Sequence, residues 1–251
     1  MQTLRYFKAK DKKVIEVIVN SSPKNKTAVL VVYGLSGSPD QSMFHNAAVL
    51  FPNKGVDVWR IRLFGWHKGA RTMLNVTWEQ MMADIHQVIG EMAKEYKNVA
   101  VIGHSMGGCQ VAYLDHPVVK VKVLWDPASV RDKKEYEASQ KIYKKCFYSN
   151  SLNPHYLTLN WGAIHMCPKA LFAASDKYEW YANNPDALPK NSYALMVIRA
   201  SMNEMYGWPQ DILPAKLVVV PDSDHCFTRA DGQNQKDLFR HTLSFIKKHA
   251  Q

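Results

Sequence analysis

The 251-residue sequence has no apolar run long enough to cross a membrane. Its longest uninterrupted runs are short ones such as AVLVVY at 28–33, whereas a spanning helix needs about 20 apolar residues. The N-terminus, MQTLRYFKAKDKK, carries basic residues but lacks the apolar stretch of a secretory signal. We therefore expect a cytoplasmic protein without stable membrane insertion, although a chain whose signal had been removed would look the same.

Cysteine is scarce, and its spacing fits no metal or disulfide framework. The four cysteines are Cys109, Cys146, Cys167 and Cys226. We expect reduced thiols that behave as small apolar side chains. The glycine-rich stretch 103–108 lacks the Lys-Ser/Thr of a phosphate loop. The sequence thus predicts no metal site and no cofactor.

The formal net charge is +10, but no nucleic-acid-binding motif accompanies it. Basic residues gather at 8–13, 131–145 and 247–248, where acidic residues interrupt the first two groups. A solvated surface is therefore favoured over a nucleic-acid surface. Binding of these patches to anionic lipid stays open, as does the oligomeric state.

Apolar, β-branched runs alternate along the chain with segments of helical spacing. Strands are predicted at 4–9, 13–20, 27–34, 56–63, 98–103, 119–125, 169–175 and 216–220. Helices are predicted at 43–53, 78–96, directly after Ser105, near 190–205 and around 235–249. The first two strands form a hairpin in this interpretation. The alternation predicts an α/β fold with a mostly parallel central sheet and helices on both faces.

Residues 127–168 interrupt this alternation, because they contain no clear strand and are rich in Lys and Tyr. A connection of this length inside a compact domain is usually a lid or a binding loop. We interpret it as a small cap inserted into a core made of 1–126 and 169–251.

The stretch NVAVIGHSMGG, residues 98–108, predicts a strand, a tight corner and a helix. Gly103 and Gly107 flank Ser105 at two residues on either side, and side chains at these glycines would clash in such a corner. Ser105 would stand exposed at the carboxyl end of the strand. The helix that begins at Met106 would direct its positive end toward a developing oxyanion. The pattern therefore predicts a nucleophilic serine.

GHSMGG in this setting resembles the α/β-hydrolase superfamily, and within it the small serine esterases and monoacylglycerol-lipase-like hydrolases. The resemblance covers nearly the whole chain, and it is specific for fold and reaction type but not for substrate. It implies a serine carboxylic-ester hydrolase that forms an acyl-enzyme on short to medium acyl or aromatic esters. Two alternatives stay open: a thioesterase or acyltransferase with the same triad, and a non-catalytic protein that binds a small ligand.

The resemblance also implies the chain order Ser, then Asp or Glu, then His. His225, in PDSDHCF after the last apolar strand, is the expected general base. Asp176 directly follows the predicted strand 169–175 and is the expected acid. Asp126, in LWDPAS after the preceding strand, is the alternative acid.

Two backbone N–H groups, those of Met106 and Leu35, are the expected oxyanion hole. Relatives usually carry His-Gly where this chain has Tyr33-Gly34, so Tyr33 is expected to brace the loop instead.

Three tryptophans are candidates for substrate binding, and each also has a plainer interpretation. Trp66 lies in FGWHKGART, which is equally typical of a solvated loop. Trp161 and Trp180 flank the end of the predicted cap, where aromatic packing is favoured over recognition.

Overall fold

The computed structural model describes residues 1–35, 37–65, 67–73, 76–129, 134, 189, 192–203, 207–211, 213–228 and 232–250. For two further strands, β7 (Tyr156–Asn160) and β8 (Ile164–Pro168), it gives the course of the backbone.

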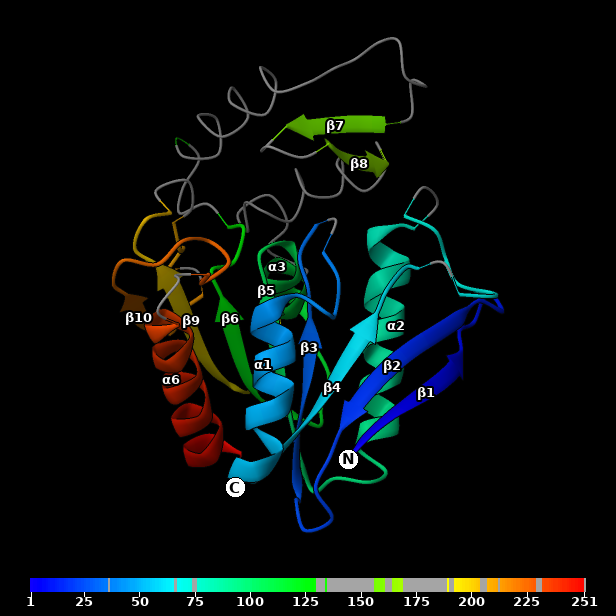
Figure 1. Cartoon of the computed structure of the whole chain (residues 1–251), viewed down its shortest axis with the longest axis horizontal. Coiled ribbons are helices and arrows are strands. Elements are labelled where there is room, and N and C mark those ends of the chain that lie inside the picture. The colour runs from blue at the N-terminus through cyan, green and yellow to red at the C-terminus, as the bar shows by residue number, and fades with distance from the viewer. Residues whose placement is uncertain are drawn as a thin grey trace.

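An eight-stranded sheet in the order β1-β2-β4-β3-β5-β6-β9-β10 forms the centre of the molecule (Figure 1). Its strands are β1 (Gln2–Lys8), β2 (Val14–Asn20), β3 (Thr27–Val32), β4 (Val56–Arg62), β5 (Asn98–His104), β6 (Val119–Trp125), β9 (Ala194–Ala200) and β10 (Lys216–Val220). β1 and β2 form an antiparallel hairpin, and β2 pairs antiparallel with β4. The remaining neighbours pair in parallel. The predicted sheet, opened by a hairpin, is confirmed.

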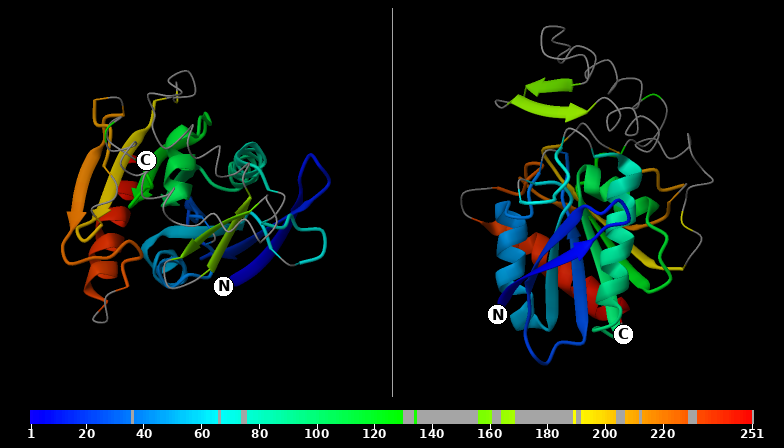
Figure 2. Two further views of the ribbon diagram at one scale, coloured as in Figure 1. Left: turned by 90° about the horizontal axis from the view of Figure 1, so that it is seen from above. Right: turned by 90° about the vertical axis from the view of Figure 1, so that its right-hand side faces the viewer.

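The helices α1 (Ser42–Leu50), α2 (Trp78–Met92), α3 (Met106–Tyr113) and α6 (Gln233–His249) cover the sheet. α1 and α6 lie on one face, and α2 and α3 lie on the other (Figures 1 and 2). Because both faces are covered, β3 and β5 are buried from their second residue onward. This double burial explains why their sequences are continuous apolar runs rather than alternating ones.

Helix α2 shows how local sequence sets an element's limits. Thr77 caps its first turn and shares a reciprocal capping box with Gln80, which satisfies two backbone N–H groups that a helix start leaves unpaired. The face predicted from the spacing of its apolar residues is the buried one; it consists of Met81, Ile85, Val88, Ile89 and Met92.

The helix predicted near 190–205 is wrong, because this segment contains strand β9, Ala194–Ala200. Its sequence, ALMVIRA, is a short apolar run that includes good helix formers. Periodicity cannot separate a buried strand from a buried helix over so short a run. Pairing with β6 and β10 on either side decides for the strand.

Two strands lie within the predicted cap, 127–168, although its sequence suggested none. β7 and β8 pair antiparallel, and this hairpin lies beyond the carboxyl ends of the parallel strands (Figures 1 and 2). The strand predicted at 169–175 lies outside the described residues. The division into core and cap stays a prediction.

Within the described part of the chain, no helix is both long and apolar enough to span a membrane.

Candidate active site

Ser105 occupies the corner between β5 and α3, as predicted. Its backbone has φ 54° and ψ −124°, a left-handed conformation that residues with side chains rarely adopt. It is also the one residue between Val99 and Leu114 that is not buried. Strain of this kind persists only where the surrounding structure enforces it, and it is typical of functional sites.

The surrounding backbone explains the glycines on either side of Ser105. A Cβ at Gly103 would lie 2.3 Å from the carbonyl oxygen of Gly107. A Cβ at Gly107 would lie 2.5 Å from the carbonyl oxygens of both Val32 and Tyr33. Neither position therefore accepts a side chain, and the tight corner predicted from the sequence is confirmed.

His225 and Asp126 form a close polar pair near this corner. His225 lies in the loop after β10, and its Nδ1 is 2.6 Å from Oδ2 of Asp126, which directly follows β6. The carboxylate is completely buried, whereas the imidazole is 27% exposed. A histidine held in this way keeps its proton on Nδ1 and leaves Nε2 as a base.

Three further donors surround the Asp126 carboxylate. The backbone N–H of Ala200 donates to Oδ1 at 3.1 Å, and the Arg199 Nε lies 3.4 Å from the same oxygen. The Asn203 amide donates to Oδ2. Burial alone would raise the pKa of Asp126, but the hydrogen bond from His225 and the charge of Arg199 together hold it below its ordinary value. Asp126 is therefore ionised at neutral pH.

Asp176, the expected acid, lies outside the described residues. The predicted strand 169–175 that precedes it also lies outside the described residues, so Asp176 stays a prediction. In the sheet, β6 pairs directly with β9, Ala194–Ala200. The alternative acid, Asp126, is the carboxylate that the structure brings to His225.

His104 links the serine corner to the histidine loop. Its Nε2 lies 2.8 Å from the backbone oxygen of His225, so Nε2 carries the proton and donates it. The two imidazole rings are 4.6 Å apart between centroids. Burial, with the nearby His225 imidazole, lowers the pKa of His104 to about 3. His104 is thus a neutral packing residue, and its hydrogen bond ties the histidine loop to the residue directly before Ser105.

The loop after β3 lies directly against Ser105. A Cβ at Gly34 would lie 2.6 Å from the Cβ of Ser105 and 3.1 Å from its Oγ. Leu35 follows in this loop, and Met106 is the first residue of α3. The first N–H groups of a helix have no acceptor within it, and the N–H of Met106 is one of these. Leu35 directly follows Gly34, which lies against Ser105. Both expected oxyanion donors therefore belong to backbone close to Ser105.

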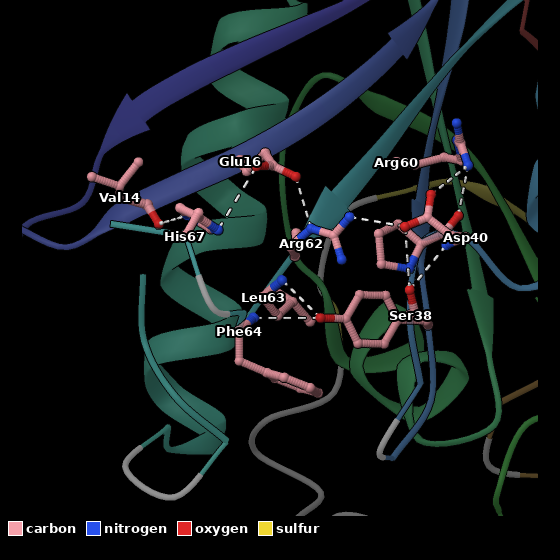
Figure 3. A network of polar contacts seen from close by, with 11 residues as sticks. Val14, Glu16, Ser38, Asp40, Arg60, Arg62, Leu63, Phe64 and His67 are labelled. Atoms are coloured by element: carbon pink, nitrogen blue, oxygen red, sulfur yellow. Dashed lines mark hydrogen bonds and ion pairs between the residues drawn. The ribbon is translucent and has the colours of Figure 1, made fainter. Parts of the chain in front are cut away.

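Tyr33 braces this loop, as the sequence predicted. Its buried hydroxyl accepts hydrogen bonds from the backbone N–H of Leu63 at 2.9 Å and of Phe64 at 3.4 Å (Figure 3). Its ring also packs edge-on against Phe64. The Tyr33 phenol thereby ties the end of β3 to the segment that follows β4.

Two arginines of β4 hold the far side of the same loop (Figure 3). The buried Arg60 donates to the backbone oxygen of Pro39 at 2.8 Å and lies 3.4 Å from a carboxylate oxygen of Asp40. Arg62 lies 2.9 Å from the other Asp40 oxygen and 2.7 Å from Glu16 on β2. We call the group Asp40, Arg60 and Arg62 the loop clamp. It fixes Pro39 and Asp40 to the sheet.

The predicted substrate-binding tryptophans, Trp66, Trp161 and Trp180, lie outside the described residues. Two residues that follow Trp66 in the sequence contact the β1–β2 hairpin. Arg71 is buried and pairs with Asp84 and with Asp11. His67 Nε2 lies 3.3 Å from the backbone oxygen of Val14.

Arg199 and Asn203 are the site residues that sequence reasoning missed. Both contact Asp126, and they belong to β9 and to the loop that follows it. The sequence predicts a helix near 190–205, so it does not predict these residues at the sheet edge where the other site residues gather. A polar cluster directly after an apolar run, RASMN at 199–203, is the signal that would have found them.

The family model described as the alpha/beta hydrolase family matches residues 29–233. The chain therefore belongs to the alpha/beta hydrolase family and is a hydrolase by family. Among curated proteins, none matches the sequence.

Solved structures agree with this fold assignment. Est1E from Butyrivibrio proteoclasticus with bound ferulic acid is 15% identical, with a TM-score of 0.70, and the match covers 97% of this chain and 99% of that one. DcsB in complex with a substrate analogue is 12% identical, with a TM-score of 0.75, and 100% and 99% are covered. The esterase domain of a Rhodothermus marinus protein is 11% identical, with a TM-score of 0.71, and both chains are covered completely. At these identities the likeness concerns the fold.

Proposed function

We propose that the protein is a serine carboxylic-ester hydrolase in which Ser105, His225 and Asp126 form the catalytic triad. The observation that carries the proposal is the contact between the partly exposed His225 imidazole and the buried Asp126 carboxylate, at the sheet edge where Ser105 stands on a strained corner. A serine hydroxyl is a weak nucleophile by itself and needs such an oriented base.

In the proposed reaction, Ser105 Oγ attacks the ester carbonyl carbon while His225 Nε2 takes the hydroxyl proton. The carbonyl oxygen becomes an oxyanion, which the backbone N–H groups of Leu35 and Met106 stabilise. The carbon–oxygen bond to the alcohol then breaks, and His225 returns the proton to the leaving alcohol. Water, deprotonated by His225, releases the acid from the acyl-enzyme and restores Ser105.

Asp126 has an electrostatic task in this scheme. It accepts a hydrogen bond from the Nδ1–H of His225, which fixes the tautomer, and its charge stabilises the imidazolium that forms in each half-reaction. Its lowered pKa keeps it ionised through the neutral range.

The experiment is hydrolysis of p-nitrophenyl esters with acyl chains from two to twelve carbons, with wild type beside Ser105→Ala. We expect turnover that depends on Ser105, with an optimum at short to medium chains. Methyl ferulate belongs in the same panel, because a structurally similar protein was solved with ferulic acid. Activity retained in Ser105→Ala would contradict the assignment of the nucleophile.

A matched pair of substrates, one oxygen ester and one thioester with the same acyl group, separates the proposed esterase from a thioesterase with the same triad. We expect the higher kcat/KM for the oxygen ester. A strong preference for the thioester would replace the proposed substrate class but keep the triad.

A further inference from the structure

Four neighbouring strands of the sheet begin next to a lysine. β4, β3, β5 and β6 lie side by side and run in parallel, so their first residues meet at one edge of the sheet. Lys26 and Lys97 directly precede β3 and β5. Lys54, the last residue of the short helix η1 (Pro52–Lys54), comes just before β4, and Lys120 lies at the start of β6. Since neighbouring strands are about 4.8 Å apart, the four lysines span roughly 15 Å of this edge.

Helix α6 brings two further lysines to the same end of the molecule. Its last turn, which contains Lys247 and Lys248, lies at the end where the parallel strands begin (Figure 1). We call the six exposed residues the amino-end lysines; they are Lys26, Lys54, Lys97, Lys120, Lys247 and Lys248. Within the described residues, none of the six forms a salt bridge.

The acidic residues described at this end do not offset the lysines. Glu91 and Glu95 are each paired with a basic residue outside the six. Asp57 is buried, and Asp115 is partly buried. The amino-end lysines therefore give this end of the molecule a positive field.

Two exposed apolar side chains lie at the same end. Val49 and Leu50, in the last turn of α1, are 57% and 37% exposed. One residue, Phe51, separates this helix from η1 and Lys54. Proteins read nucleic acids with arginine forks and aromatic faces, whereas all six basic residues here are lysines. Lysines beside exposed aliphatic side chains are typical of peripheral proteins that bind anionic bilayers.

We propose that the amino-end lysines form a docking surface for an anionic phospholipid bilayer, with Val49 and Leu50 entering the headgroup region. The inference goes beyond the proposed function and does not depend on it. Ser105 follows the opposite end of β5, whose 7 residues span about 23 Å. A protein docked in this way holds the Ser105 corner away from the bilayer, where substrate arrives from water.

Co-sedimentation of the full chain with vesicles tests the docking surface. Wild type should bind vesicles of phosphatidylcholine that contain about 30% phosphatidylserine, and it should not bind phosphatidylcholine alone. Binding should weaken at least about tenfold when NaCl is raised from about 0.05 M to about 0.5 M, because salt screens exposed charges.

A triple variant removes the centre of the surface. Lys26→Gln combined with Lys54→Gln and Lys97→Gln should weaken binding to the anionic vesicles about 100-fold, because each lysine near an anionic leaflet contributes roughly fivefold. Circular dichroism verifies that the variant is folded.

A second triple variant has the same net charge and serves as the control. Lys8→Gln combined with Lys10→Gln and Lys13→Gln removes three lysines at the other end of the β1–β2 hairpin. Binding should weaken less than about threefold, because charges farther than a Debye length of about 10 Å from the bilayer are screened.

A matched pair of valine variants tests the apolar contribution. Val49→Ser should weaken vesicle binding about fivefold, because it removes apolar surface that the headgroup region covers. Val219 on β10 is 61% exposed, close to the 57% of Val49, and Val219→Ser should leave binding unchanged.

Three results would overturn the inference. Folded wild type that does not bind anionic vesicles would show that no such surface exists. Equal losses in the two triple variants would show that net charge alone drives binding. Tighter binding to a short DNA duplex than to vesicles at the same ionic strength, lost in the variant at Lys26, Lys54 and Lys97, would assign the surface to nucleic acid.

Discussion

His225 Nδ1 lies 2.6 Å from a carboxylate oxygen of Asp126, and the two residues are 99 positions apart in the sequence. The completely buried carboxylate is held in place from β9, by Ala200 and by Arg199. The pair is therefore a rigid unit rather than a surface ion pair, and it supports the proposal that Asp126 orients His225.

Asp126→Asn should accordingly lower kcat by about 10⁴-fold, because an amide that donates toward Nδ1 favours the wrong imidazole tautomer. Asp176→Asn, at the acid expected from the sequence, is the comparison, and it should change kcat less than about twofold when Asp126 orients the base. The two variants are compared in steady-state ester hydrolysis after circular dichroism has verified folding. Loss of activity in Asp176→Asn, with Asp126→Asn unaffected, would reverse the assignment.

Of two glycine-to-alanine changes, one should abolish activity and the other should raise stability. Gly34→Ala would place a Cβ 2.6 Å from the Cβ of Ser105, so the loop that carries Leu35 must shift and esterase activity should be lost. Gly90, inside α2, has no atom within 4 Å of an added Cβ. Gly90→Ala should therefore raise the free energy of unfolding by about 0.5–1 kcal/mol through helix propensity, with activity unchanged. Chemical denaturation and ester assays on both variants check this, and an active Gly34→Ala would disprove the close approach.

Much of the architecture could be predicted from the sequence. The apolar runs of β3 and β5 and the helical spacing of α2 are long or regular enough to define their elements without tertiary information. The strained corner at Ser105 was also predictable, because its flanking glycines are explained by backbone contacts of the kind the pattern implies.

The error at 190–205 had a physical cause with consequences for the site. The run ALMVIRA suits a helix or a buried strand, and only its pairing with β6 decides. Once this segment is a strand, RASMN at 199–203 moves to the carboxyl edge of the sheet, and Asn203 reaches Asp126. Contacts between residues far apart in the chain determine such a site, and one sequence does not contain them.

The loop clamp should affect both stability and catalysis. Arg60→Met removes the donor to the backbone oxygen of Pro39 and one charge partner of Asp40. Leaving a buried acceptor without its donor should cost about 1–3 kcal/mol of unfolding free energy. The loop that carries Leu35 should become less ordered, so kcat should fall more than KM rises. Arg240→Met, which breaks an exposed pair with Asp237 on α6, is the control and should change neither quantity measurably. Equal behaviour of the two variants would show that the clamp has no part in catalysis.

Lys122 should make stability depend on pH. Its ammonium on β6 is buried, donates to the backbone oxygens of Ala112 and Leu114 at the end of α3, and lies 3.7 Å from the centre of the Tyr193 ring. Burial lowers the pKa of Lys122 to about 7. Between pH 7 and the ordinary lysine pKa of about 10.4, the unfolded chain therefore binds more protons at this site than the folded one does.

Stability from this group consequently rises with pH across that window, by at most about 1.4 kcal/mol per pH unit. The wild-type free energy of unfolding, minus that of Lys122→Met, should increase between pH 7.5 and 9.5. Urea denaturation at four pH values measures the difference, in which the other titrating groups cancel. A difference that stays constant or falls would contradict the lowered pKa.

The most direct measurement of the central claim is covalent labelling by a fluorophosphonate, with the modified peptide located by mass spectrometry. Labelling requires a serine activated by an oriented base, and it does not depend on knowing the substrate. The triad proposed here predicts rapid modification at Ser105 alone in wild type, and labelling slowed by several orders of magnitude in both His225→Ala and Asp126→Asn. No labelling of folded wild type, or labelling at Ser105 that is unchanged in Asp126→Asn, would contradict the account.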